Sequence, residues 1–164
     1  MLWFNRRALL AIPLALAACG FTPAFGPSGP ATALRGTIAL SDTNSRDGFE
    51  FIKRVEDRLG RPSAARFDLD YRIATKKASL GFTIDGAITR FNLTGSVTWT
   101  LKDRATGKVL ANGVEQNFTA WSATGVTIAA VNAESDAKAR LIRILADQVI
   151  QRLIALSPTL TLAE

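Results

Sequence analysis

An alternation of apolar and polar residues between positions 65 and 121 is the feature that most constrains the fold of this chain. A period of two is typical of a β-strand with one buried face. In the first stretch, Phe67, Leu69, Tyr71 and Ile73 alternate with Asp68, Asp70, Arg72 and Ala74. The apolar phase then flips after Lys77, which predicts a bulge near Lys76–Ser79. Asp85-Gly86 predicts a hairpin turn.

Two more strands follow this turn. The first begins near Ile88 and sets Leu93, Val97, Trp99 and Leu101 against Thr94, Ser96, Thr98 and Thr100, with Gly95 at one apolar-phase position. A polar turn at 102–108 leads to a strand over 109–121, in which Leu110, Val114, Phe118 and Ala120 share one phase. Residues 122–131 predict a loop with some strand character.

Two segments have helical periodicity. Residues 47–59 carry apolar Phe49, Ile52, Val55 and Leu59 at steps of three and four. Residues 41–45 can cap this helix, and Gly60 and Pro62 end it. Residues 133–156 form the longer helix, with Asn132 as its cap and Pro158 after its end. Its apolar stripe is Ala137, Leu141, Ile144, Leu145, Val149, Leu153 and Leu156, and Glu134–Lys138 and Asp136–Arg140 are expected pairs along it.

A first short strand at 34–40 completes the order β-α-β-β-β-α. This order predicts an α+β fold in which two amphipathic helices pack on one face of a four-stranded mixed or antiparallel sheet. The single domain spans 34–158, and 159–164 form a frayed tail. The Thr and Ser face of the strand over 93–101 lies away from the helices, where it is either solvated or presented to a partner.

The N-terminus has the layout of a bacterial secretory signal. Arg6 and Arg7 precede an apolar stretch, and Leu16-Ala17-Ala18 leads into the only cysteine, Cys19. Leu16-Ala17-Ala18-Cys19 looks like a lipobox. The resemblance implies that residues 1–18 are removed and that Cys19 receives a diacylglycerol and an N-acyl chain. Residues 19–33 then form a lipidated tether rich in Pro and Gly. The alternative is an ordinary signal peptide with a chance cysteine.

Composition argues against an enzyme. The chain has no histidine, which excludes Ser-His-Asp and Cys-His catalysis and the usual zinc ligands. It has no glycine-rich phosphate loop. Asp68 and Asp70 share a strand face, where two solvated acids are a simpler interpretation than a catalytic pair. We expect no metal and no cofactor other than the acyl chains on Cys19.

The charge is mildly basic. Loss of Arg6 and Arg7 with the signal would lower the formal charge from +6 to +4. An exported protein has no reason to meet nucleic acid, whereas anionic lipid phosphates attract Lys and Arg. A soluble surface with scattered charge is the simpler alternative.

Several motifs together resemble the lipopolysaccharide-assembly lipoprotein family, LptE, of alphaproteobacterial type. They are Cys19-Gly20-Phe21-Thr22-Pro23 after the lipobox, the strand from Leu93 to Asp103, the hairpin Ala105-Thr106-Gly107-Lys108-Val109-Leu110 and the helix start Ala133-Glu134-Ser135-Asp136-Ala137. The resemblance implies a non-enzymatic lipoprotein anchored at the periplasmic face of the outer membrane. Its implied partners are lipopolysaccharide and the LptD β-barrel, whose lumen it plugs and whose assembly it aids.

For lipopolysaccharide or barrel contact, the first candidates are Lys102, Arg104 and Lys108, because three cations lie on one short turn. Arg90, Lys76 and Lys77 come second. The alternative is that all six are solubilising charges of turns and edge strands.

Two other functions stay open from the sequence. A lipid-binding auxiliary lipoprotein of another envelope lipid transporter would need an apolar pocket between sheet and helices. A periplasmic hydrolase would need convergent carboxylates in a cleft.

Overall fold

A computed structural model describes residues 25–26, 29, 31–82, 88–122 and 127–161. Its elements are β1 (Ile38–Leu40), α2 (Arg46–Leu59), β2 (Phe67–Phe82), β3 (Ile88–Asp103), β4 (Val109–Ser122) and α3 (Thr127–Thr161). This order confirms the predicted β-α-β-β-β-α sequence. Residues 1–18, Cys19 and the Asp85-Gly86 turn lie outside the described residues.

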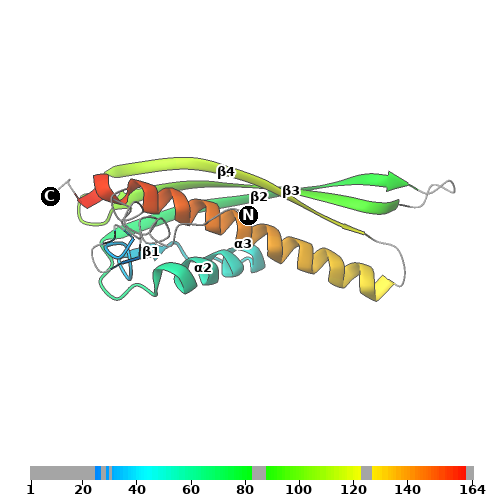
Figure 1. The fold of residues 1–164 in the computed structure, drawn as a ribbon, viewed down its shortest axis with the longest axis horizontal. Helices are drawn as coiled ribbons and strands as arrows, with labels where there is room; N and C mark the ends of the chain where they lie inside the picture. The colour runs from blue at the N-terminus through cyan, green and yellow to red at the C-terminus, as the bar shows by residue number, and fades with distance from the viewer. Residues whose placement is uncertain (1–24, 27–28, 30, 83–87, 123–126, 162–164) are drawn as a thin grey trace, which may run out of the picture.

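The four strands form one mixed sheet in the order β1-β2-β3-β4. The short β1 pairs in parallel with the start of β2, from Phe67 to Leu69, and the other pairs are antiparallel. Figure 1 shows β2, β3 and β4 as one long layer with α2 and α3 on the same side of it. The predicted α+β architecture is therefore confirmed.

The core lies between this sheet and the two helices. Its wholly buried side chains include Phe51 and Val55 of α2, Leu69 of β2, Val97 and Leu101 of β3, and Leu141, Leu145, Val149 and Leu153 of α3. The apolar phase of β3 faces the helices, as predicted. Its Thr and Ser residues therefore face the opposite side of the sheet, which we call the outer face.

Helix α3 is longer than the sequence predicted at both ends. It begins at Thr127, so the expected loop at 122–131 is wrong from Thr127 onward, and Asn132 lies inside the helix rather than at its cap. Pro158 lies inside the helix instead of after it. Proline has no N–H to donate to the carbonyl of Ile154, and the Ser157 hydroxyl donates to that oxygen at 2.7 Å instead. The helix can therefore pass through Pro158 and reach Thr161.

Helix α2 buries Val55 and Leu59 as predicted, but Gly48 and Phe51 complete its buried stripe in place of Phe49 and Ile52. Its buried residues are Gly48, Phe51, Val55 and Leu59, whereas Phe49 is 61% exposed. Gly48 packs so closely on Thr43 that a Cβ there would collide with the threonine side chain. This contact rotates Phe49 outward. The predicted ends are confirmed, because Ser45 caps the first turn through a 3.0 Å bond from Gly48 N and Gly60 ends the helix at φ +81°.

The strands also differ from the prediction in detail. The register shifts fall between Ser79 and Phe82 rather than between Lys76 and Ser79. The first strand is confined to Ile38–Leu40, because residues 31–37 form turns. In β4 the phase that carries Val114 and Phe118 faces outward, and these side chains are 55% and 65% exposed.

The polar phase of β4 faces α3 because it finds partners there. The Thr119 hydroxyl donates to Ala137 O at 3.0 Å, and Glu115 Oε1 lies 3.2 Å from Arg152 Nε. The ion pair expected within α3 between Glu134 and Lys138 is replaced by pairs with other elements. Glu134 pairs with Lys77 at 2.6 Å, and Lys138 pairs with Asp47 at 3.0 Å.

Candidate functional site

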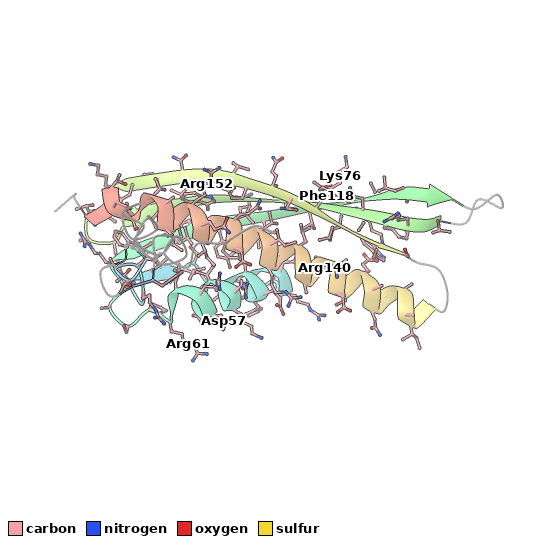
Figure 2. All side chains as sticks on the ribbon, viewed as in Figure 1. Asp57, Arg61, Lys76, Phe118, Arg140 and Arg152 are labelled. Carbon is pink, nitrogen blue, oxygen red and sulfur yellow. The ribbon has the colours of Figure 1, made fainter. Side chains whose placement is uncertain are left out.

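The outer face of the sheet carries a strip of hydroxyl groups along β3. Thr94 and Thr98 are exposed, and Ser96 and Thr100 are half-buried. The strand register places Lys76 of β2 and Phe118 of β4 on either side of Thr94. Figure 2 shows both of these side chains on the same side of the sheet, away from α3. The strip therefore has a cation on one side and an aromatic ring on the other, and the outer face also carries the exposed side chain of Val114.

The turn between β3 and β4 ends the outer face and is held by its own hydrogen bonds. Asp103 Oδ1 accepts bonds from the N–H and the hydroxyl of Thr106 at 2.8 and 2.7 Å. These bonds lower the pKa of Asp103. Gly107 closes the turn at φ +69° and donates to Asp103 O at 2.8 Å. The turn therefore holds Arg104 and Lys108 in fixed, exposed positions.

Two of the three candidate cations at this end are paired. Lys102 Nζ lies 2.7 Å from Asp70 Oδ2, and Arg104 Nη1 lies 3.6 Å from Asp68 Oδ1. The hydrogen bond from Lys102, aided by one from Ser41, holds the pKa of Asp70 below its usual range. The Asp70 carboxylate in turn raises the pKa of Lys102. Asp68 and Asp70 thus serve as ion-pair partners, and an incoming phosphate would compete with them for the cations.

Lys108 is the most available cation of this turn. It is exposed, and among the residues that the structure describes it makes no ion pair. Its ammonium group can therefore meet an anionic ligand without first leaving a carboxylate.

The structure adds Arg66 to this end of the sheet. Arg66 O accepts a 2.9 Å bond from Arg104 N, and its guanidinium lies 5.3 Å from the centre of the Phe67 ring. Arg66 and Arg104 share a surface groove of about 380 Å³ with Ala65, Asp103 and Ala105. Sequence analysis missed Arg66 because only the pairing of Phe67 with Asp103 brings it to the turn. We call Arg66, Lys102, Arg104 and Lys108 the basic turn.

The second group of candidates does not join the basic turn. Lys76 lies eight positions beyond Asp68 along β2, which is about 26 Å at 3.3 Å per residue. Arg90 is exposed near the far end of β3. Lys77 points to the helix side, where its Nζ lies 2.6 Å from Glu134 and 4.4 Å from the centre of the Phe91 ring. Lys77 therefore fastens α3 to the sheet and is not a free contact residue.

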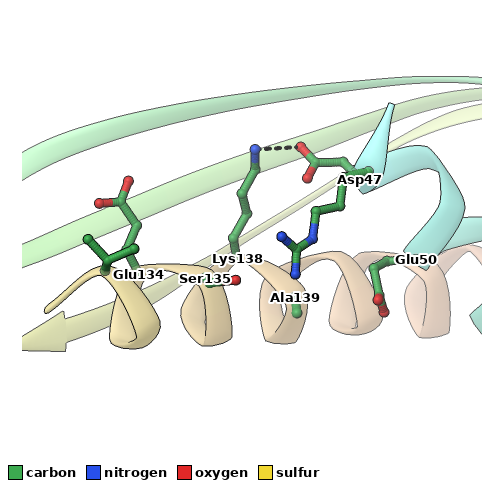
Figure 3. Close-up of a pocket in the computed structure, with 8 residues that line it drawn as sticks. Asp47, Glu50, Glu134, Ser135, Lys138 and Ala139 are labelled. Atoms are coloured by element: carbon green, nitrogen blue, oxygen red, sulfur yellow. Dashed lines mark ion pairs between the residues drawn. The ribbon is translucent and has the colours of Figure 1, made fainter. Parts of the chain in front are cut away.

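The described surface grooves are small, with volumes of about 140 to 380 Å³. Figure 3 shows one of about 270 Å³ between the start of α2 and α3, which the ion pair of Lys138 with Asp47 crosses. Within the described residues, no cluster of three or more His, Cys, Asp or Glu side chains could hold a metal ion. No helix in that same part of the chain is long and apolar enough to cross a membrane.

Solved structures share this fold. A protein from Caulobacter crescentus described as a lipoprotein is 20% identical, with a TM-score of 0.65 over 78% of this chain and 96% of the other. Rare lipoprotein B from Shewanella oneidensis is 12% identical, with a TM-score of 0.59 over 76% and 97%. A minor lipoprotein from Acinetobacter baumannii is 17% identical, with a TM-score of 0.54 over 73% and 89%. At these identities the likeness concerns the fold.

A search of curated proteins finds no match. The family model described as LptE, lipopolysaccharide-assembly, matches residues 36–153, which include every element from β1 to most of α3. The chain therefore belongs to the LptE family of lipopolysaccharide-assembly proteins.

Proposed function

We propose that this chain is a non-enzymatic lipoprotein that assembles with the LptD β-barrel and plugs its lumen during lipopolysaccharide insertion into the outer leaflet. The observation that carries the proposal is the outer face, where the hydroxyl strip of β3 stands opposite a filled core. The lumen of an outer-membrane barrel is polar, and a plug needs a hydroxyl-rich, mildly charged surface to lie against it. Family membership supports the same role.

The filled core favours a plug over a lipid carrier. Phe51, Leu141 and Leu145 are wholly buried between the sheet and the helices. At Gly95 even one added methyl group would lie 2.9 Å from a leucine side chain. An acyl chain would need a continuous apolar cavity in this layer, and these contacts fill it.

We further propose that Cys19 carries the lipid anchor and places the domain at the periplasmic face of the outer membrane. Two or three acyl chains on one residue would give lasting attachment, whereas a single chain binds only marginally. Mass spectrometry of the mature N-terminal peptide should show the acyl chains, and a Cys19→Ser variant should leave the protein unprocessed and without them.

Lipopolysaccharide contact is assigned to the basic turn in this proposal. Its guanidinium and ammonium groups suit phosphate, and guanidinium can bind phosphate with two hydrogen bonds. Lys76 and Arg90 remain candidates for barrel or lipopolysaccharide contact at the other end of the outer face.

Purification with a C-terminal tag from native outer membranes in mild detergent tests the proposed partner. We expect one large β-barrel at a one-to-one ratio, identified by mass spectrometry. Recovery of an inner-membrane transporter, or of the chain with bound lipid and no protein partner, would overturn the plug proposal in favour of a lipid-binding auxiliary role.

A further inference from the structure

Within the described residues β4 is an edge strand of the sheet, and its outer edge is open. In an antiparallel ladder, alternate residues direct both backbone groups to the same side. Leu69 O of β2 accepts a hydrogen bond from Ser41 N, just after β1, so the backbone groups of odd-numbered β2 residues point away from β3. The backbone groups of even-numbered β2 residues therefore point toward β3. The strand registers pair even-numbered β2 residues with even-numbered β3 residues, and odd-numbered β3 residues with odd-numbered β4 residues. The backbone groups of even-numbered β4 residues therefore point to the open edge.

Side chains occupy two backbone groups in the far part of this edge. Phe118 N–H donates to Asn117 Oδ1 at 2.8 Å, and Ala120 O accepts from Arg140 Nη2 at 3.5 Å. In the described part of the chain, no hydrogen bond reaches the edge-directed backbone groups of Asn112, Val114 and Gln116. These three residues offer three donors and three acceptors in a row.

Most edge strands carry charges or proline that oppose pairing with another strand. The open part of β2 does so, with Arg72, Lys76 and Lys77 and a shifted register near its end. Strand β4 contains no Lys, Arg or Pro. Its one charged residue, Glu115, turns inward to Arg152, with a side chain only 13% exposed. The β4 edge is thus the unprotected edge of this sheet.

A groove runs beside the same three residues. It has a volume of about 320 Å³ and lies between β4 and the last turns of α3, lined by Trp99, Asn112, Gly113, Val114, Glu115, Arg152, Ala155 and Leu156. Gly113 leaves room for the Trp99 ring that lines the groove, because a Cβ there would lie 2.8 Å from that ring. Beneath the groove, Trp99 Nε1 is buried and has no hydrogen-bond partner in the part of the chain that the structure describes.

Arg152 stands at the rim of this groove. Its side chain is 68% exposed, and only its Nε meets Glu115. The two terminal amino groups have no partner within the described residues, so they can donate to a second acceptor. Figure 2 shows Arg152 beside β4.

We propose that an extended segment of the barrel partner adds to the edge of β4 at Asn112–Gln116 as a further strand. In such pairing, main-chain hydrogen bonds give affinity and a neighbouring pocket selects a side chain. Here the selected side chain is an Asp, Glu, Asn or Gln that lies over Gly113 and accepts hydrogen bonds from Arg152. The inference rests on the proposed function for the identity of the partner.

Amide hydrogen exchange tests this pairing without any variant. The amides of Val114 and Gln116 are compared between the free full-length chain, at two concentrations, and the complex purified from outer membranes. A partner present at 100 times its dissociation constant should slow their exchange about 100-fold. The amides of Thr75 and Lys77, on the open edge of β2, are the matched control and should exchange alike in both states.

The outcomes separate the two proposals. If no barrel is recovered, the proposed function fails. If the barrel is present but Val114 and Gln116 exchange as in the free chain, the pairing fails and the proposed function stands. If their exchange slows in the free chain as its concentration rises, a second copy occupies the edge and the assignment to the barrel is wrong.

A pair of proline variants gives a second test. Val114→Pro removes an N–H that faces the open edge and leaves the ladder with β3 intact, and Thr75→Pro does the same on β2. We expect Val114→Pro to lower barrel recovery at least tenfold and Thr75→Pro to leave it unchanged. Equal recovery with two folded variants would overturn the pairing.

Discussion

Gly95 of β3 lies directly against Leu141 of α3. A methyl group placed on Gly95 would fall 2.9 Å from Leu141 Cδ2 and 3.0 Å from Leu145 Cδ1. Both leucines are wholly buried and have little room to move. This contact sets how closely the long helix approaches the sheet, and it explains why a glycine occupies an apolar-phase position in β3.

We expect Gly95→Ala to lower the free energy of unfolding by about 1–3 kcal/mol, since overpacking a filled core forces side chains from their rotamers. Thr94→Ala, one residue away on the exposed outer face, should change it by less than about 0.5 kcal/mol. Urea unfolding followed by tryptophan fluorescence measures both. Equal midpoints for the two variants would contradict the close packing of α3.

Arg54 joins α2 to α3 through a two-pronged ion pair. Its Nε and Nη2 lie 2.9 and 2.8 Å from the two carboxylate oxygens of Asp147, and the bond to Asp147 raises the pKa of Arg54. The pair is partly exposed, so we expect Arg54→Lys to lower the unfolding free energy by about 0.5–1 kcal/mol. Arg61→Lys, whose partner Glu56 lies 3.4 Å from an 88% exposed side chain, is the control and should cost nothing measurable. If both variants match the wild type at low salt, the pair does not hold the helices together.

Tyr71 predicts a loss of stability at alkaline pH. Burial raises the pKa of this phenol above its ordinary value of 10.0. Between the unfolded and folded pKa values, the folded state keeps a proton that the unfolded state has lost. Stability should therefore fall as pH rises above 10 and stop falling beyond the folded pKa. Tyr71 is the only tyrosine, so absorbance at 295 nm reports it alone, and a midpoint at 10 or below would contradict its burial.

Removal of the Tyr71 hydroxyl gives an independent check. Among the described residues no group lies within hydrogen-bond geometry of its buried oxygen, while the ring stacks on Phe51 with centroids 4.6 Å apart. Tyr71→Phe keeps the stacking and should leave stability unchanged or raise it by up to about 1 kcal/mol. It should also remove the alkaline loss. Clear destabilisation would reveal a hydrogen bond to this hydroxyl.

Changing Lys102, Arg104 and Lys108 together to Gln should weaken lipopolysaccharide binding. The loss should be larger at low salt, because at physiological ionic strength exposed charges are already screened beyond about 8 Å. A control variant changes Lys53 of α2, Arg61 just after α2 and Arg143 of α3 to Gln. It removes the same charge from the other side of the molecule and should bind nearly as the wild type does. Binding measured across a salt series separates them. Unchanged binding of the turn variant at low salt would remove this assignment.

Local pattern was enough to predict the element order and the faces of β2 and β3, because their apolar residues alternate cleanly. It failed where a partner far away in the chain decides. The polar side chains of Glu115 and Thr119 face α3 because they form hydrogen bonds there, Glu115 with Arg152 and Thr119 with the carbonyl oxygen of Ala137. Phe49 turns outward because Gly48 must lie against Thr43.

The candidate site shows the same limit. The short spacing of Lys102, Arg104 and Lys108 predicted that they would lie on one turn. It could not show that Asp70 and Asp68 neutralise two of them, or that Arg66 joins them, because β2–β3 pairing brings these residues together. Lys76 and Lys77 point to opposite faces of the sheet, because side chains alternate along a strand. Lys77 therefore pairs with Glu134 and lies over the rings of Phe91 and Trp121, whereas Lys76 lies on the outer face.

The most direct test of the account is the fraction of newly made lipopolysaccharide that reaches the outer leaflet after the chain is depleted from its own bacterium. We expect this fraction to fall and to be restored by the wild-type chain, with barrel assembly impaired in parallel. Unchanged delivery of lipopolysaccharide after complete loss of the chain would contradict the proposed function.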